Sequence, residues 1–443
     1  MVKVIPFRAY RYDKAKVGDL SKVVAPPYDV IKDKMVDTLQ SSSPYNMAWI
    51  SKNKPTGSDN DSNNQYTRAR DIWKKWLKEG AVKQDSKECF YVYGHDFEAA
   101  GRRLFRFGFI GLLELEDFAA KPPAKGPFAG VLQHEETLPK DIMDRLSLCR
   151  QSMTQFGLIF VIYPDPKREV DSVLERYIKN APLLDVTDTE GVRHRLWAVD
   201  NPTDTKKISE LMKDKYVIIA DGHHRYKTAL ALSKENPGVP SAKYRMLTFV
   251  NMANPGLVIL PTHRLVQNLE NFSRQKLLDG VKQSFEVRDF KTREDMFAFM
   301  RKQSDGKRHA FGLFLNDGKF YVLTLKDVSL MNKVVPDKSP QWRSLDVAIL
   351  HSLILDKVLG IDKEKLSQGT MKGEGYVIYI KDVGDAVDEA IRSVKEKAQA
   401  VFFMNPPKVD EVEAVSRNFE IMPQKSTFFA PKLFDGLTMN KLT

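Results

Sequence analysis

Cysteine is almost absent from this sequence: Cys89 and Cys149 are the only two among 443 residues. Two thiols can form one bridge at most, which excludes a disulfide-stapled secreted domain and favours a reducing, cytoplasmic compartment. Long apolar runs are lacking too, and none approaches the roughly 20 residues that cross a bilayer. The apolar stretch within residues 1–8 is too short and too interrupted for a signal peptide. We therefore expect a cytoplasmic protein with no membrane partner.

The common nucleotide and metal signatures are also missing. The sequence contains no Gly-x-x-x-x-Gly-Lys-Ser/Thr phosphate loop, no Gly-x-Gly-x-x-Gly after a strand, no Cys-x-x-Cys pair and no Gly-x-Ser-x-Gly elbow. These absences exclude the usual motifs of ATPases, dinucleotide-binding enzymes, zinc ribbons and esterases. Any catalytic site must therefore be built from a less common motif.

Positive charge is in excess but is not concentrated. The chain carries 69 Lys and Arg against 58 Asp and Glu, a net charge of +11, with no long basic block. A dispersed excess favours anionic small ligands, or weak contact with polyanions, over a dedicated nucleic-acid groove. We expect no nucleic-acid partner, and the sequence leaves the oligomeric state open.

One stretch concentrates polar chemistry. The β-rich run 216–220 is followed by Asp221-Gly222-His223-His224-Arg225 and then by apolar residues at helical spacing up to residue 233. The pattern predicts a strand, a tight turn and a helix. The free N–H groups of a helix N-terminus suit an anionic ligand, and a carboxylate such as Asp221 at a strand end can hold Mg²⁺ or accept a substrate proton. The alternative is a simple Asp-Gly turn with solvated His and Arg side chains.

A second polar motif, His134-Glu135-Glu136-Thr137, precedes a helical stretch that we expect over 141–153. It is not a zinc-protease motif, because Leu138 stands where the second His is needed. The segment is either functional or simply the start of a helix with acidic residues in its first turn.

Three further segments contain candidate binding residues. Two prolines present Tyr28 and Asp29 on a stiff loop, which is either structural or functional. His263 and Arg264 follow the apolar run 257–260, so they either reach the anion bound near residue 225 or form an exposed turn. The extended strip 422–432, with Lys425, Ser426 and Thr427, is either a contact surface or a tail fastened to the core by its aromatic residues.

The order of elements predicts an α+β fold with mixed sheets, because hairpins alternate with helices and no uniform βαβ series occurs. We expect three segments, 1–125, 126–265 and 266–443, with a proline-rich loop at 121–127 near the first boundary. Among the elements we expect a strand at 47–50, helices at 271–285 and 345–358, and a hairpin over 310–325.

Six motifs together carry a resemblance to a known family. They are Ala25 to Asp29, Ser43 to Asn46, His134 to Thr137, Ala220 to Tyr226, Leu260 to Arg264 and Met422 to Lys432. In this order they resemble the family called domain of unknown function 1015, from near the first residue to near the last. The Asp-Gly-His-His-Arg motif is also similar, more distantly, to the phosphate-binding motif of the ParB/sulfiredoxin-like fold and its free serine kinases.

The distant resemblance implies a ParB/sulfiredoxin-like core within 126–265 and a kinase that transfers phosphate from ATP or ADP, with Mg²⁺, to the hydroxyl of L-serine. It implies that Glu135 is the catalytic base and that Asp221 serves the metal or the substrate hydroxyl. The implied phosphate-binding residues are Thr137, Gly222, His223, His224 and Arg225, with Arg264 as a further candidate. Weaker candidates for substrate binding are Tyr28, Asp29, His263, Lys425, Ser426 and Thr427.

Two alternatives to a kinase remain at this point. One is a ParB-like switch that binds or hydrolyses CTP or ATP and contacts a protein or DNA partner. The other is a scaffold in which the motif is structural. The resemblance does not decide the acceptor or the nucleotide base.

Overall fold

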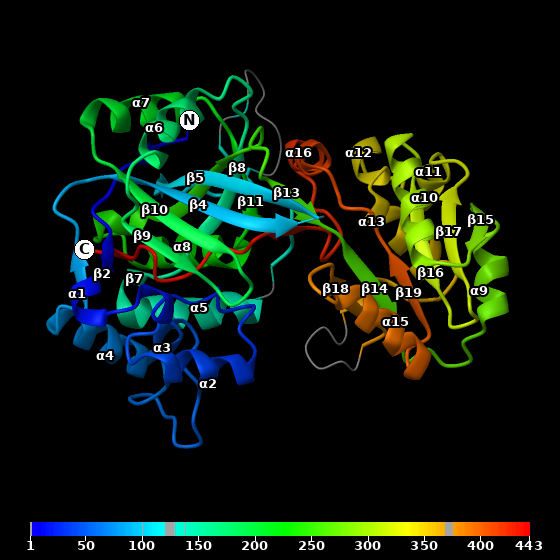
Figure 1. The fold of residues 1–443 in the computed structure, drawn as a ribbon, viewed down its shortest axis with the longest axis horizontal. Helices are drawn as coiled ribbons and strands as arrows, with labels where there is room; N and C mark the ends of the chain where they lie inside the picture. The colour runs from blue at the N-terminus through cyan, green and yellow to red at the C-terminus, as the bar shows by residue number, and fades with distance from the viewer. Residues whose placement is uncertain (1, 100, 120–127, 129, 138, 368–374) are drawn as a thin grey trace. The chain divides into compact units, whose positions relative to one another are not determined.

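The computed structural model describes the chain except residues 1, 100, 120–127, 129, 138 and 368–374 (Figure 1). The chain forms two compact units: unit 1 comprises Met1–Val258 and Pro431–Thr443, and unit 2 comprises Ile259–Ala430. The expected loop at 121–127 lies outside the described residues, and the division into three segments stays a prediction. No helix in the described part of the chain is both long and apolar enough to span a bilayer.

Unit 1 is built on a large mixed sheet. In its described part, nine strands take part: β1 (Val4–Ile5), β4 (Phe90–Ala99), β5 (Arg102–Glu114), β6 (Val131–Leu132), β8 (Ile159–Tyr163), β9 (Leu184–Thr187), β10 (Arg193–Val199), β11 (Val217–Asp221) and β12 (Tyr244–Asn251). The order is β6-β11-β8-β12-β5-β4-β10-β9, and β1 pairs with β5. β11 runs parallel to β6 and antiparallel to β8, while β12 runs parallel to β8. The expected α+β class with mixed sheets is therefore confirmed.

Helices cover this sheet because its strands are apolar on both faces. Helices α6 (Glu169–Ile178) and α7 (Pro202–Met212) lie above the sheet in Figure 1, and α5 (Pro139–Ser152) lies below it. The apolar side chains of α6 and α7 join a core made with the strands, which includes Val170, Leu174, Ile208 and Phe249. Helix α8 (His223–Glu235) packs on α5.

A second core lies in the N-terminal part of unit 1. Trp73 and Trp76 of α4 (Gln65–Lys78) are almost fully buried against α5 and the first strands, as their helical spacing predicts. The remaining small elements are β2 (Tyr10–Tyr12), β3 (Val82–Gln84), α1 (Lys14–Val17) and α2 (Asp33–Ser42). The strand expected at 47–50 is wrong: the segment is a helix, α3 (Ala48–Ser51). The Asn46 side chain accepts a hydrogen bond from the backbone N–H of Ala48 at 2.9 Å, which starts the helical turn.

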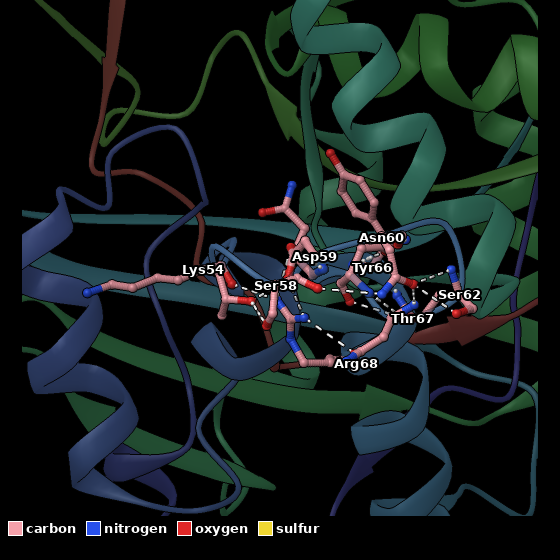
Figure 2. A network of polar contacts seen from close by, with 12 residues as sticks. Lys54, Ser58, Asp59, Asn60, Ser62, Tyr66, Thr67 and Arg68 are labelled. Carbon is pink, nitrogen blue, oxygen red and sulfur yellow. Dashed lines mark hydrogen bonds and ion pairs between the residues drawn. The ribbon is translucent and has the colours of Figure 1, made fainter.

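The polar loop before α4 is organised by its own side chains (Figure 2). Arg68 donates to both carboxylate oxygens of Asp59, at 2.7 and 3.2 Å. Asn64 caps α4 by accepting from the backbone N–H groups of Tyr66 and Thr67. Two-point contact between a guanidinium and a carboxylate holds a loop of low apolar content in one conformation.

The last residues of the chain return to unit 1. Strand β21 (Asn440–Lys441) pairs with β7 (Thr154–Gln155), and Asp435 forms a backbone bridge with Ala25. This tail brings Lys432 and Asp435 beside residues that lie more than 200 positions earlier in the sequence. Both side chains belong to the candidate site described below.

Unit 2 contains its own sheet, whose neighbouring strands pair antiparallel. In its described part, six strands take part in the order β15-β17-β16-β19-β14-β18: β14 (Thr262–Val266), β15 (Phe285–Phe290), β16 (Ala310–Phe314), β17 (Phe320–Leu325), β18 (Val377–Lys381) and β19 (Ala400–Phe403). Helices α10 (Arg293–Asp305) and α15 (Ala386–Glu396) bury Met296, Met300 and Ile391 against it. β13 (Val258–Leu260) pairs with β20 (Phe428–Ala430).

The sequence predicted the hairpin of β16 and β17 but not all of unit 2. The helix expected at 271–285 is shorter, α9 (Arg274–Val281), because Phe285 already begins β15. The helix expected at 345–358 is α13 (Asp346–Ile349) continued by a π-helix, Leu350–Asp356. The remaining helices are α11 (Leu330–Val334), α12 (Pro340–Arg343), α14 (Lys363–Ser367) and α16 (Val409–Arg417).

Candidate functional site

The structure confirms the strand, turn and helix around Asp221. β11 ends at Asp221, Gly222 takes a left-handed conformation with φ +98°, and α8 begins at His223. Four residues, His223 to Tyr226, therefore supply the first N–H groups of a 13-residue helix, and the N–H of Tyr226 donates to Gly222 O. The N-terminus of a helix carries a partial positive charge and therefore favours the binding of an anion.

Gly222 is required for this turn on two grounds. A Cβ at this position would combine a positive φ with a contact of 3.0 Å to Arg225 Nε. Gly222→Ala is therefore expected to lower the free energy of unfolding by about 2–3 kcal/mol, measured by urea denaturation. Gly191→Ala is the matched control, since Gly191 also has a positive φ, +80°, but open space around it. A cost for Gly222→Ala no larger than that of the control would contradict the crowding at Arg225.

Two cations neutralise Asp221. Arg225 Nη2 donates to Oδ2 at 2.6 Å, and Lys432 Nζ donates to Oδ1. Burial alone would raise the pKa of Asp221, but Lys432 and Arg225 hold it well below its usual range. Asp221 is therefore a carboxylate at neutral pH, and both of its oxygens are already hydrogen-bonded.

This arrangement does not fit Mg²⁺ at Asp221 as it stands. A metal ion there would have to displace Arg225 or Lys432 from a carboxylate oxygen. No group of three or more His, Cys, Asp or Glu able to hold a metal ion occurs among the described residues. Magnesium binding at Asp221 stays a prediction.

Glu135 lies beside the start of α8. Its Oε2 is 3.6 Å from Nδ1 of His223, and the backbone N–H of His134 donates to Nε2 of the same imidazole at 3.3 Å. The topology explains the meeting: β6 and β11 are parallel neighbours, so the residues that follow both strands emerge at one edge of the sheet. Burial holds the pKa of His223 well below its usual value. A neutral His223 that accepts at Nε2 carries its proton on Nδ1, facing the Glu135 carboxylate.

Two other predicted residues lie around this edge. His224 is half-buried, with Nε2 3.6 Å from Oδ2 of Asp141 in α5. Thr137 is half-buried in the connection between β6 and α5. Glu135 keeps about a third of its side-chain surface exposed, so a ligand can reach it from solvent.

Arg225 also lines a small chamber of about 50 Å³. Arg145, Arg245, Asp435 and Tyr28 line the same chamber. The guanidinium carbon of Arg145 lies 3.9 Å from the centre of the Tyr28 ring. The structure therefore brings the predicted residue Tyr28 to Arg225, and the exposed Asp29 is near enough to raise the pKa of Arg225 together with Asp221.

Three buried atoms of residues that line the chamber have no hydrogen-bond partner among the described residues: Ser51 Oγ, Arg245 Nη1 and Asp435 Oδ1. Buried polar groups are normally paired, so these atoms point to a ligand or to ordered water. Burial raises the pKa of Asp435 to about 7 and lowers that of Arg245 to about 10.

The raised pKa of Asp435 gives a testable pH dependence. Between about pH 4 and pH 7 the folded protein keeps a proton on Asp435 that the unfolded chain has lost, so this group makes stability fall as pH rises. Asp435→Asn removes the effect. We expect the urea midpoint of Asp435→Asn, relative to the unsubstituted protein, to be higher at pH 8 than at pH 5. A difference that does not change with pH would show that Asp435 titrates normally.

The remaining predicted residues belong to unit 2. Arg264 and His263 are neighbours in β14, so their side chains lie on opposite faces of the sheet. His263 packs on Phe403, with ring centres 5.2 Å apart, while Arg264 donates to the backbone oxygen of Lys425 at 3.2 Å. The alternative of an exposed turn is wrong, because both side chains are buried in a strand. Ser426 is buried and Thr427 half-buried in the segment after Lys425.

The sequence matches the model of a family described as "Protein of unknown function (DUF1015)" over residues 4–348. That match spans more than half of the chain. The chain belongs to the DUF1015 family. No curated protein matches this DUF1015 protein significantly.

Several solved structures are similar to this DUF1015 protein at low identity. A free serine kinase in complex with AMP has 13% identity and a TM-score of 0.34, covering 68% of this chain and 83% of that one. A conserved hypothetical protein from Pyrococcus furiosus has 12% identity and a TM-score of 0.32, covering 69% and 90%. SbnI with a C-terminal truncation, from Staphylococcus aureus, has 11% identity and a TM-score of 0.32, covering 68% and 81%. Likenesses of this strength do not identify a function.

Sequence reasoning missed four residues of the site in this DUF1015 protein: Lys432, Asp435, Arg145 and Arg245. Lys432 lies in the strip 422–432, for which the sequence left a contact surface and a fastened tail open, and nothing in the sequence connects that strip with Asp221. Arg145 lies within the predicted helix 141–153. No local pattern marks Arg245 or Asp435, because each lines the chamber only through residues brought from elsewhere by the fold.

Proposed function

We propose that this protein is a nucleotide-dependent kinase of a small hydroxyl-bearing molecule, with L-serine as the first candidate acceptor and ATP or ADP as the donor. One observation carries the proposal: Glu135 lies 3.6 Å from His223 at the N-terminus of α8, beside the cluster of Asp221, Arg225 and Lys432. A carboxylate, an anion-binding helix end and nearby cations are the parts that phosphoryl transfer needs.

Each part has a role in the proposal. The first N–H groups of α8 and the side chains of His223 and His224 bind the nucleotide phosphates. Glu135 accepts the proton of the acceptor hydroxyl. At the same time the hydroxyl oxygen bonds to the terminal phosphorus, and the bond between that phosphorus and the rest of the nucleotide breaks. Lys432 and Arg225 keep Asp221 ionised and fix the turn that presents the helix end.

The chamber beside Arg225 supports an amino acid as the acceptor. A zwitterion carries a partner for each of the two unpartnered ionisable groups: a carboxylate for Arg245 Nη1 and an ammonium for Asp435 Oδ1. The volume of about 50 Å³ favours a very small acceptor such as serine over a sugar or a nucleoside. Tyr28 closes one side of this chamber.

One incubation tests the proposal. The purified protein is mixed with ATP, ADP or CTP, Mg²⁺ and a mixture of amino acids, and phosphorylated amino acids are sought by mass spectrometry. O-phosphoserine is the expected product. Nucleotide hydrolysis without any phosphorylated product would instead support a switch of the ParB kind, and absence of nucleotide binding would support a scaffold. Either of these outcomes would overturn the kinase proposal.

A further inference from the structure

Unit 2 contains a pocket of its own, with a volume of about 250 Å³. It lies between the start of β14, the start of α13, and the Pro406-Pro407 segment that leads into α16. The side chains that matter for its chemistry are those of Thr262, Arg264, Arg308, Asp346, Lys408 and Ser426.

The alternation of β14 directs Arg264 to this pocket. Thr262 and Arg264 share one face of the strand and both line the pocket, whereas Leu265 faces the apolar core with Val401 and Phe403. The sheet therefore fixes the stem of Arg264 on a rigid element. Groups on strands hold their geometry better than groups on loops.

Arg264 is buried without a counter-charge. Its three hydrogen bonds go to neutral acceptors: His351 Nε2 at 3.3 Å, the backbone oxygen of Thr262, and the backbone oxygen of Lys425 at 3.2 Å. His351 is itself neutral, since burial holds its pKa well below the usual value. Within the described residues, no carboxylate lies within ion-pair distance of Arg264, which is 1% exposed.

Arg225 in unit 1 is also a buried guanidinium, but it is paired with the carboxylate of Asp221, which is the usual arrangement for a buried charge. An unpaired buried charge is costly, and the fold keeps one at Arg264. Two of its five N–H donors remain for a ligand after the three hydrogen bonds above.

The other charged groups add to the positive potential. Lys307, Arg308 and Lys408 join Arg264 on the lining, against the carboxylates of Asp346 and Glu411. Both carboxylates are already engaged. Asp346 lies 2.7 Å from Nδ1 of His309, and Glu411 accepts from the backbone N–H of Lys408 at 2.9 Å. Arg308 is itself paired with Glu286 at 3.2 Å, so the lining keeps a surplus of one positive charge. That surplus favours an anionic group such as a phosphate monoester, which carries a charge of about −2 near neutral pH.

We infer that this pocket binds a small metabolite carrying a phosphate group, with Arg264 as the central contact. Thr262 supplies a hydroxyl on the same lining, and Lys408 meets the phosphate from the rim. The inference stands on unit 2 alone and does not depend on the kinase proposal.

Hydrogen exchange of the full-length protein tests the inference without nucleotide present. The probes are inorganic phosphate and glycerol 3-phosphate, with succinate at equal ionic strength as the carboxylate control. We expect both phosphate probes, but not succinate, to slow exchange in peptides covering 344–350 and 404–411. Protection confined to 221–230, or no protection anywhere, would overturn the inference.

Substitutions sharpen this test. Arg264→Met is expected to weaken the protection of 344–350 and 404–411 by about tenfold or more, the effect of losing a hydrogen-bonded charge. Its melting temperature is measured in parallel. Protection equal to that of the unsubstituted protein would overturn the assignment of Arg264.

A rim variant keeps the inference testable if Arg264→Met fails to fold. Lys408→Gln changes an exposed side chain on the pocket lining and is expected to weaken binding up to about fivefold. Lys302→Gln is the matched control, because Lys302 is also exposed but does not line the pocket. Equal effects of the two substitutions would count against the pocket. Protection of 221–230 and O-phosphoserine formation report separately on unit 1, so failure of either proposal is recognisable.

Discussion

Glu135→Gln is expected to lower kcat by about 10²–10⁴-fold while the dissociation constant of the nucleotide stays close to that of the unsubstituted protein. The reason is that glutamine keeps the shape and polarity of Glu135 but cannot accept the hydroxyl proton. Its position beside His223, one-third exposed, makes a loss of folding unexpected. Turnover is measured as O-phosphoserine formed per minute, and binding by titration calorimetry with ADP.

Glu136→Gln provides the control for Glu135→Gln. Glu136 is the next residue, is exposed, and would lose the same charge from the same segment. We expect it to change kcat less than threefold, about the size of one weak surface interaction. Normal turnover in Glu135→Gln, or an equal loss in both variants, would remove Glu135 from the mechanism.

Arg225→Ala is expected to cost about 3 kcal/mol of folding free energy and to weaken nucleotide binding as well. Breaking a buried ion pair costs about 3–5 kcal/mol, because the remaining charge is left without compensation. We expect the lower end of this range because Lys432 still contacts Asp221. The substitution also removes the hydrogen bond to the backbone oxygen of Leu158, which ties α8 to β8. Urea denaturation gives the stability, and calorimetry gives the affinity.

Arg150→Ala is the control for Arg225→Ala. Arg150 of α5 pairs with Glu235 at the end of α8 at 2.6 Å, but both side chains are about 40% exposed, at 43% and 39%. An exposed pair contributes about 0–1 kcal/mol, so this variant should unfold close to the unsubstituted protein. Equal losses of unfolding free energy in the two variants would show that burial does not make the Arg225 pair more stabilising than an exposed pair.

Local rules were enough to predict the strand, turn and helix around Gly222. The β-rich run, the Asp-Gly turn and the helical spacing all act within about 20 residues. They were not enough at 47–50, where four apolar residues suit a strand or a helix equally well, and the side chain of Asn46 decides for a helix. Phe285 shows the same limit, since one aromatic residue can end a helical pattern or begin a strand.

The partners of the central motif were harder to predict. Glu135 was placed near it only through a resemblance, and the physical cause, the parallel pairing of β6 and β11, is a tertiary fact that spacing does not encode. The sequence left open whether His263 and Arg264 reach one anion together or form an exposed turn, but they are adjacent residues of a strand and point to opposite faces. Lys432 reaches Asp221 across 211 positions of sequence, and no pattern in a single sequence reports such a pair.

The return of residues 431–443 to unit 1 has a consequence for synthesis. Unit 1 is interrupted by the whole of unit 2, so a ribosome releases the residues up to 258 long before it releases Lys432 and Asp435. Until then Asp221 is paired with Arg225 but not with Lys432, and the chamber lacks the carboxylate of Asp435. The nascent protein therefore acquires the charge arrangement at Asp221 only when residues 431–443 emerge, and a chain cut before residue 431 will lack it however well its sheet forms.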